Sequence, residues 1–280
     1  MVLGCGWVGN EPDIIMITEV IPKCQSNPIA PALLSIDGYK PNFNFQPDTA
    51  NLGQSGIRGV AIYSKTSLNA TEVDMKIENF TDHVWIEVPT NEKPLLVGCI
   101  YRSPSNDTDK EACMKSATVT SQLIKLAYAT SDSVVIAGDF NYKEINWECD
   151  YSAQEHQSVF INGLHECFLH QHVTEPTRFR ENETPNLLDL LITSDESMIA
   201  DLAYHPPLGE SDHLCLRFNV RCGKEVVTRE ESKERNIYKF DEEFSRWYCL
   251  YFKSYISTDF ASYCDILRCE LEENFWSCKK

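Results

Sequence analysis

The chain has 280 residues, an apolar fraction of 42% and a formal net charge of −17 at pH 7. This length and apolar content suffice for a globular core, and no apolar run approaches the roughly 20 residues that span a bilayer. The acidic balance, which falls almost entirely on residues 1–220, argues against a simple nucleic-acid-binding module, because such modules are usually basic. A polyanion would be repelled unless metal ions or a local basic patch offset this field.

The amino terminus and the cysteines predict an intracellular protein. Residues 1–13 lack the basic start and apolar core of a signal peptide, so we expect the twelve cysteines to be reduced thiols. No Cys-x-x-Cys pair occurs, and His170-Gln171-His172 is more typical of an ordinary strand than of a zinc site. Gly4-x-Gly6-x-x-Gly9 matches a dinucleotide fingerprint in form only, because no strand of adequate length precedes it.

Hydrophobic patterning along residues 1–220 predicts many short strands and two amphipathic helices. The helices are expected at 111–128 and 152–167. Apolar runs separated by Gly, Asn, Asp and Pro predict strands at 14–18, 58–65, 83–88, 94–102, 134–137, 186–193 and 213–220. Many strands with few helices favour an α/β sandwich of two sheets over a regular βαβ series.

The composition changes after residue 220. Residues 221–236 are charged and have no apolar pattern, which is typical of a linker. Residues 237–280 show helical spacing with aromatic faces, and we expect helices there that pack on the domain or on sequence not present here. The chain is therefore divided into a domain at 1–220, a linker at 221–236 and a helical segment at 237–280.

Potential ligands stand at the ends of several predicted strands. Glu19, Tyr101-Arg102 and Asp212-His213 are examples. Asp139 and Asn141 are two residues apart, so in extended backbone they point to the same side. An ordinary polar turn is the competing interpretation of this Gly-Asp-Phe-Asn stretch, since Gly, Asp and Asn commonly form turns.

Asp189 is the least ordinary of the acidic residues, because it lies inside the apolar run "NLLDLLIT". An ionised carboxylate among leucines costs several kcal/mol unless a partner compensates it. A histidine is a suitable partner, because the bond to the acid fixes its tautomer and raises its basicity.

These residue types suit metal-assisted phosphodiester hydrolysis. Mg²⁺ prefers one or two carboxylates together with water and phosphate oxygens. An attacking water needs a base, and the charge that develops on the phosphate needs donors such as amide, phenol, guanidinium or imidazolium.

Six segments occur in the order found in the endonuclease/exonuclease/phosphatase superfamily: "PDIIMITE", "GVAIYSK", "VGCIYRSPS", "VVIAGDFNYKEINWE", "EPTRFRENETPNLLDLLIT" and "GESDHLCLRF". The chain most resembles the apurinic-type endonuclease domain of non-LTR (LINE-like) retrotransposon polyproteins, over roughly residues 11–220. The resemblance implies a DNase I-like fold, that is, a four-layer α/β sandwich of two mixed sheets flanked by helices. It also implies a Mg²⁺-dependent endonuclease, with Mn²⁺ as an alternative, that nicks DNA and leaves a 3′-hydroxyl. DNA and a reverse transcriptase domain of the parent polyprotein would be partners, no membrane would be involved, and a functional enzyme would act in the nucleus.

The resemblance also implies a role for each matching residue. Glu19 and Asp212 would hold the metal. Tyr101 and His213 would contact the scissile phosphate, and Asp189 would pair with His213. The other roles are these: Asp139 would orient or deprotonate the attacking water, Asn141 would hold Asp139 and the phosphate, Arg102 and Asn186 would lie near the substrate, and Arg178 would meet the DNA backbone or pack beside the site.

The match fails at the amino terminus. The superfamily opens with a strand that carries a catalytic Asn and with a helix, whereas eleven residues precede Pro12 here. Asn10 is better interpreted as a turn residue. We therefore expect an amino-terminally truncated domain with a gap in the sheet next to Ile15 and Ile17. A catalytically impaired retrotransposon-derived remnant and a superfamily phosphatase acting on small phosphoesters are the alternatives to an active endonuclease.

Overall fold

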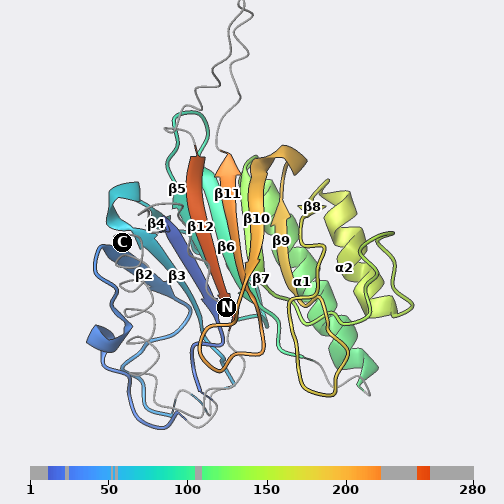
Figure 1. Ribbon diagram of the computed structural model, residues 1–280, viewed down its shortest axis with the longest axis horizontal. Coiled ribbons are helices and arrows are strands. Elements are labelled where there is room, and N and C mark those ends of the chain that lie inside the picture. The colour runs from blue at the N-terminus through green and yellow to red at the C-terminus, as the bar shows by residue number, and fades with distance from the viewer. Residues whose placement is uncertain are drawn as a thin grey trace, which may run out of the picture.

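The computed structural model describes residues 12–22, 25–51, 53, 56–104, 109–221 and 245–252. Two six-stranded sheets pack face to face, and two α-helices lie on the outer side of the second sheet (Figure 1). Each sheet contains parallel and antiparallel neighbours. The DNase I-like sandwich of mixed sheets flanked by helices is thus confirmed.

The first sheet has the strand order β10-β11-β12-β1-β3-β2. Three of its strands were not predicted from the sequence. The buried and exposed residues of β2 and β10 do not alternate cleanly, and β12 lies in a stretch that was expected to be helical. The strands are β1 (Ile14–Thr18), β2 (Tyr39–Phe43), β3 (Val60–Lys65), β10 (Ile199–His205), β11 (Cys215–Arg221) and β12 (Ser245–Phe252).

The second sheet has the order β4-β5-β6-β7-β9-β8. Its strands are β4 (Thr71–Glu72), β5 (His83–Val88), β6 (Leu95–Tyr101), β7 (Val134–Asp139), β8 (His170–Gln171) and β9 (Asp189–Thr193). The helices are α1 (Lys110–Thr130) and α2 (Glu155–Glu166), with short 3₁₀ turns η1 (Pro31–Leu34), η3 (Thr66–Leu68) and η4 (Glu196–Met198).

Strand β7 shows why the second sheet is buried on both faces. Val135 and Ala137 belong to the apolar cluster between the sheets, whereas Val134 and Ile136 belong to the cluster beneath the helices. Side chains alternate between the two faces of a strand, so a strand buried on both sides must be apolar at every position. The sequence 134–137 meets this requirement without a polar residue.

Both predicted helices are present, within a few residues of the expected bounds. Asp109 caps α1 by accepting a hydrogen bond from the Ala112 amide at 3.0 Å, which satisfies one of the free N–H groups of the first turn. Helices α1 and α2 cover the second sheet with one apolar face each. In the described part of the chain, neither helix combines the length and apolarity that crossing a bilayer requires.

The expected gap beside β1 does not occur, and that prediction is wrong. Strand β12 lies there, parallel to β1 and antiparallel to β11, with Leu250 opposite Met16 on one side and opposite Leu216 on the other. The helical expectation is therefore also wrong for Ser245–Phe252. Without a strand between them, β1 and β11 would each present an edge of unpaired N–H and C=O groups. The eight-residue strand β12 pairs with both edges.

Several other expectations fall on residues that the structure does not describe. Asn10, the Gly4-x-Gly6-x-x-Gly9 stretch and the linker at 221–236 beyond Arg221 are among them, as is the helical segment at 237–280 outside β12.

Candidate active site

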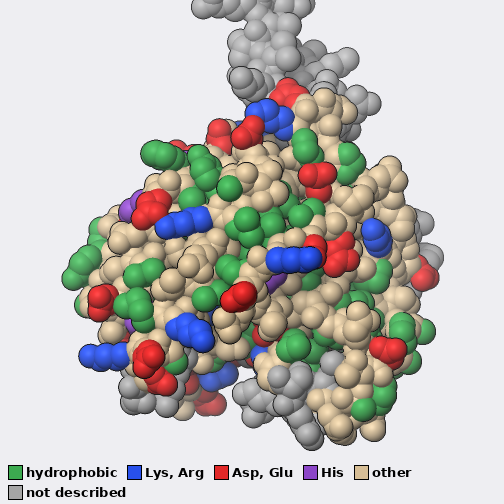
Figure 2. All heavy atoms as spheres, turned by 180° about the vertical axis from the view of Figure 1, so that it is seen from behind, with side chains coloured by type: hydrophobic (Ala, Val, Ile, Leu, Met, Phe, Trp, Pro, Cys, Tyr) green, Lys and Arg blue, Asp and Glu red, His purple; other side chains and the backbone are tan. Residues whose placement is uncertain are grey.

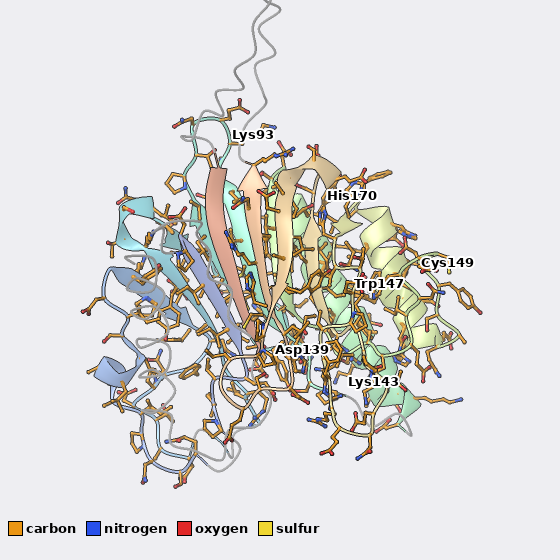
Figure 3. The ribbon with its side chains drawn as sticks, viewed as in Figure 1. Lys93, Asp139, Lys143, Trp147, Cys149 and His170 are labelled. Atoms are coloured by element: carbon orange, nitrogen blue, oxygen red, sulfur yellow. The ribbon has the colours of Figure 1, made fainter. Side chains whose placement is uncertain are left out.

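The predicted site residues gather where several strands of both sheets end. Tyr101, Asp139 and Asp189 stand directly opposite one another across β6, β7 and β9, because the register pairs Tyr101 with Asp139 and Asp139 with Asp189. Figure 3 shows Asp139 at the lower end of the central strands. Glu19 follows the last residue of β1, and His213 precedes β11 by two residues.

The end of β7 depends on Gly138. A Cβ atom at this position would lie 1.8 Å from the carbonyl oxygen of Ile100, so only glycine lets β6 and β7 approach this closely. The chain then turns sharply, and Asn141 takes a left-handed φ of 52°. Its amide donates to Asp139 Oδ1 at 3.1 Å, and its side-chain nitrogen donates to the Arg102 carbonyl at 2.9 Å. The turn that the sequence suggested and the polar site are therefore the same feature.

One part of the site, which we call the histidine half, consists of Asp139, Asp189 and His213. The His213 Nδ1 atom lies 2.8 Å from Asp189 Oδ2 and 3.1 Å from Asp189 Oδ1. Asp189 is completely buried and His213 is 3% exposed. The pairing expected for Asp189 is thus present. Thr177 supports this pair, because its hydroxyl oxygen accepts a hydrogen bond from the Asp189 backbone amide at 3.1 Å.

Mutual electrostatics set the protonation of the histidine half. Burial alone would lower the pKa of His213, but the charge and hydrogen bond of Asp189 and the charges of Asp139 and Asp212 raise it above its ordinary value. Burial raises the pKa of Asp139 well above its ordinary value, and Asp189 and Glu19 raise it further, while His213 opposes them. An imidazolium beside a buried acid cluster is the state that these shifts favour.

Asp212 adjoins His213 and is held by two arginines. Its Oδ2 atom accepts from Arg178 Nε at 2.9 Å and also from Arg180 Nε. Its Oδ1 atom is buried without a hydrogen-bond partner and lies 3.9 Å from His213 Nε2. Burial by itself would raise the pKa of Asp212, but His213 and both arginines outweigh it and lower that pKa.

The other part of the site, the glutamate half, consists of Glu19, Arg58 and Tyr101. Glu19 Oε1 accepts from the Tyr101 hydroxyl at 2.7 Å and from Arg58 Nε at 3.1 Å. Glu19 has a left-handed φ of 55°, which is unusual for a residue other than glycine, asparagine or aspartate. Burial, followed by the charges of Glu19 and Asp139, raises the pKa of Tyr101, so its hydroxyl stays a donor at neutral pH.

Sequence reasoning missed Arg58 and its support, Asp82. Asp82 Oδ1 accepts from the amides of Arg58 and Gly59, each at 3.1 Å, and from Asn44 Nδ2 at 2.9 Å. Burial raises the pKa of Asp82, against the lowering effect of these three hydrogen bonds and of the nearby Arg58 charge. An arginine directly before a strand and an aspartate directly before another were the available signals, but exposed strand ends are commonly charged.

Arg102, which the resemblance puts near the substrate, is held by protein groups. It is only 2% exposed, lies over the Tyr142 ring at 4.2 Å, and donates to the Phe140 carbonyl at 3.2 Å and to Ser116 Oγ at 3.1 Å. A guanidinium with these internal partners braces the turn after β7.

The remaining predicted residues form the wall beside His213. Arg178 is 7% exposed, and its backbone bridges to Asn186 and to His213. Of the two roles considered for Arg178, packing beside the site agrees with this burial. Asn186 donates from its side chain to the Thr184 carbonyl at 2.6 Å, so its amide closes the local turn.

The donor set fits a hard divalent cation. Asp139 and Asp189 each offer a carboxylate oxygen, and these atoms and a ring nitrogen of His213 lie within 4.8 Å of one another. The buried Oδ1 atom of Asp212 has no hydrogen-bond partner, which costs free energy unless a cation or donor approaches it. Carboxylate oxygens are the ligands that Mg²⁺ and Mn²⁺ prefer.

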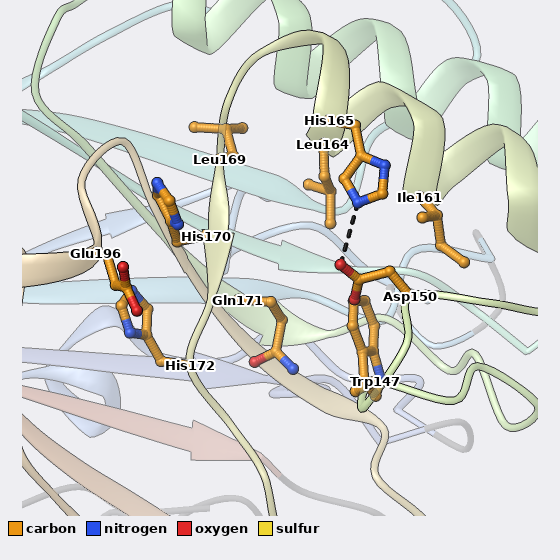
Figure 4. Close-up of a pocket in the computed structure, with 10 residues that line it drawn as sticks. All are labelled: Trp147, Asp150, Ile161, Leu164, His165, Leu169, His170, Gln171, His172 and Glu196. Atoms are coloured by element: carbon orange, nitrogen blue, oxygen red, sulfur yellow. Dashed lines mark hydrogen bonds and ion pairs between the residues drawn. The ribbon is translucent and has the colours of Figure 1, made fainter.

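A separate cavity of about 380 Å³ lies at the far edge of the second sheet (Figure 4). Burial lowers the pKa of His172 there to about 4, and this residue contacts Thr193 Oγ1 at 2.6 Å. His170 belongs to the short strand β8, as its triplet predicted. The residues that line the cavity include none of the predicted site residues: Trp147, Asp150, Ile161, Leu164, His165, Leu169, His170, Gln171, His172 and Glu196.

One face of the molecule offers little obvious attraction for a polyanion. On the described part of the face in Figure 2, acidic and basic side chains are interspersed and form no broad basic patch. Arg102 and Arg178, the arginines expected near substrate, are bonded to protein groups.

Comparison with known proteins agrees with this geometry. Residues 95–217 match the family described as endonuclease-reverse transcriptase. The fold is similar to the endonuclease domain of TRAS1, a telomere-specific non-LTR retrotransposon, with a TM-score of 0.50 and 16% identity over 68% of this chain and 81% of that one. It is equally similar to the 3′-5′ exonuclease NExo from Neisseria meningitidis, with a TM-score of 0.50 and 14% identity over 73% and 88% of the two chains. No match was found among curated proteins.

A further similar structure is the 3′ phosphatase NExo from Neisseria bound to product DNA hairpin, with a TM-score of 0.50 and 15% identity over 73% of this chain and 87% of that one. At these identities the structural similarities show the fold. Together with the matched family, they support phosphodiester hydrolysis and a hydrolytic, nuclease-like enzyme.

Proposed function

We propose that the chain, whose residues 95–217 match the endonuclease-reverse transcriptase family and whose fold is similar to that of a retrotransposon endonuclease domain, is a metal-dependent DNA endonuclease. In this proposal it nicks one strand and leaves a 3′-hydroxyl, as the target-site nuclease of a non-LTR retrotransposon. The observation that carries the proposal is the buried convergence of Asp139, Asp189 and His213 within 4.8 Å at the ends of three chain segments.

His213 is the proposed donor to the phosphate. Its Nδ1 atom is bonded to Asp189, which orients the ring, and Nε2 is the atom proposed to donate to the substrate. The raised pKa favours the protonated ring, which can stabilise the negative charge that grows on a non-bridging oxygen. The Tyr101 hydroxyl, which donates to Glu19 Oε1 at 2.7 Å, is proposed as a second donor that turns to the phosphate when substrate binds.

Asp139 is the proposed proton acceptor for the attacking water. It is 4% exposed, and the Asn141 amide fixes its Oδ1 atom. Burial makes this carboxylate a stronger base than an exposed aspartate, because it raises the pKa of Asp139 well above its ordinary value. Asn141 acts as a positioning residue through its bonds to Asp139 and to the Arg102 carbonyl.

Glu19 and Asp212 are proposed to hold Mg²⁺, or Mn²⁺ in its place, with the histidine half as a further source of oxygen ligands. Such a cation would supply Lewis-acid stabilisation of the phosphate and neutralise part of the acidic field. DNA is the proposed substrate, and a reverse transcriptase domain of the parent polyprotein is the proposed covalent partner.

Nicking of supercoiled plasmid tests this function. We expect Mg²⁺-dependent conversion to the open circle, abolished by EDTA and reduced about 10²–10⁴-fold in Asp139→Asn and His213→Ala. Asp132→Asn, an exposed aspartate paired with Lys93, is the matched control and should nick normally. Equal activity in all variants would refute the assigned site. Release of phosphate from 3′-phosphorylated ends without nicking would favour the phosphatase alternative, and a folded but inert chain would favour the remnant.

A further inference from the structure

The guanidinium of Arg58 stands in the site with a donor that no protein group uses. Its Nε atom bonds Glu19 Oε1 at 3.1 Å, whereas its Nη1 atom is buried and has no hydrogen-bond partner. A buried charged donor without an acceptor is costly, and in native structures it marks a missing partner. The partner that fits is a small anion between the two halves of the site.

The backbone of Arg58 is fixed on both sides. Its amide donates to Asp82 Oδ1 at 3.1 Å, and its carbonyl accepts from the Ile21 amide at 2.9 Å. Gly59 follows with a φ of +78°, and a Cβ atom there would lie 2.6 Å from a methyl carbon of Val20. Only glycine fits this close approach, so the chain holds the arginine root firmly beside the end of β1.

The charge of Arg58 favours an anion such as a phosphate over a cation as its partner. Its charge acts on the Tyr101 hydroxyl, whose oxygen shares Glu19 Oε1 with Arg58 Nε. Tyr101 in turn lies opposite Asp139 in the sheet. A planar guanidinium with a second N–H free is suited to the oxygens of a phosphate group, and a divalent cation would be repelled by it.

We infer that Arg58 is a binding residue for the phosphate group of the substrate, reached through its Nη1 atom. The inference rests on the proposed function, because that function supplies a phosphate as ligand. Glu19 bonds the Nε side of the guanidinium and competes with the phosphate for its charge. Arg58 thereby supplies positive charge in the glutamate half of the site.

Inorganic phosphate tests the inference without requiring turnover. The melting temperature of the whole chain is followed during a phosphate titration in EDTA, for the wild type, Arg58→Gln and Arg58→Lys. We expect phosphate to stabilise the wild type, Arg58→Gln to lose about tenfold or more in phosphate affinity, and Arg58→Lys to lose less. Lys65→Gln is the control, because Lys65 lies at the other end of β3 in an ion pair with Asp13 at 3.3 Å.

A second variant separates binding from a purely structural role. Glu19→Gln removes the competing anion and should tighten phosphate binding, and this gain should shrink when Arg58 is also replaced. Equal phosphate affinity in the wild type and Arg58→Gln, or no phosphate effect on the wild type, would overturn the inference.

Duplex DNA provides the arm that judges the proposed function. In EDTA, the dependence of log affinity on log salt should become shallower by about one in Arg58→Gln, as expected for the loss of one phosphate contact. Arg58-dependent binding of inorganic phosphate without any affinity for DNA would keep the phosphate residue and reject the DNA endonuclease. DNA binding with the same affinity and salt dependence in the wild type and Arg58→Gln would keep the DNA endonuclease and reject Arg58 as the phosphate-binding residue.

Discussion

The histidine half and the glutamate half of the site handle charge in different ways. Asp189 and His213 are a pair sealed from solvent, with 0% and 3% side-chain exposure. The side chains of Glu19 and Arg58 form a pair that is 12% and 13% exposed, so solvent or a ligand can reach either partner. The first pair holds a protonation state in place, and the second leaves a carboxylate and a guanidinium accessible to ligands. The two pairs thus differ in how far solvent reaches them.

Strand β12 connects the two halves. It lies between β1, which leads to Glu19, and β11, which follows His213. Neighbouring strands are about 4.8 Å apart, so β12 sets the lateral spacing of the two halves. The deletion or disruption of this strand should therefore have the largest effect of the changes considered below.

Removal of residues 222–280 should abolish cooperative folding of the domain. Two interior strands would lose a complete ladder, and the cost should approach the total of about 5–15 kcal/mol that stabilises a typical domain. Urea unfolding followed by tryptophan fluorescence measures this loss. Leu250→Pro, which removes a donor in the middle of both ladders, should be severely destabilised as well. Leu250→Val keeps the donor and should fold, and a stable, cooperative truncated chain would contradict the position of β12.

Replacement of the two acids tests the comparison directly. Asp189→Ala should lower the free energy of unfolding by about 3–5 kcal/mol, because it leaves the buried His213 without its partner. Glu19→Gln should change it by about 1 kcal/mol or less, since its pair with Arg58 is nearer to solvent. Equilibrium urea unfolding at pH 7 measures both values. Similar losses for the two variants would mean that the halves do not differ as described.

The pH dependence of stability isolates the histidine half. The folded-state pKa of His213 is raised above its ordinary value of 6.5, so its contribution is fully present below pH 6.5 and is lost as the pH rises through the folded pKa. Stability should therefore fall with rising pH above 6.5. Urea titrations at several pH values measure the slope.

His213→Gln should flatten that slope, because the glutamine side chain does not titrate. Glu19→Gln should leave most of the slope in place and serves as the control from the other half. A wild-type stability that increases over the same range would contradict the charged state assigned to His213.

The smallest expected loss of stability concerns Asp82, which supports the Arg58 backbone of the glutamate half. All three of its shorter hydrogen bonds go to Oδ1, so Asp82→Asn can keep them and should cost less than about 1 kcal/mol. Asp82→Ala leaves two buried amides without an acceptor and should cost about 1–3 kcal/mol. Thermal unfolding resolves the difference, and equal effects of the two changes would show that Asp82 does not hold the Arg58 backbone.

The sequence predicted the parts of the fold that local patterns control. Continuous apolar runs identified β1, β5, β6 and β7, and the buried acid among leucines pointed to the pair of Asp189 and His213. Pairings between strands that are far apart in the sequence could not be predicted from local patterns. The aromatic stretch that contains β12 has helical spacing, yet the unpaired edges of β1 and β11 determine its structure.

The arginines show the same limit at the level of side chains. Arg102 follows a strand next to Tyr101, which favoured a substrate contact, but the space over Tyr142 and the carbonyls of the β7 turn bury it. Arg58 has no distinguishing motif, and only the close approach of Gly59 to β1 brings it to Glu19. The position of a residue along a strand indicates the face to which its side chain points. How deeply that side chain is buried depends on residues in other strands.

Single-turnover cleavage of an end-labelled DNA duplex tests the central claim most directly, namely that the histidine half performs phosphodiester hydrolysis with a divalent cation. The wild type should cleave in Mg²⁺ and not in EDTA, with a 3′-hydroxyl at the new end. Asp139→Asn should be slower by about 10²–10⁴-fold. Cleavage that persists in EDTA, or that proceeds at the same rate in Asp139→Asn, would contradict this assignment.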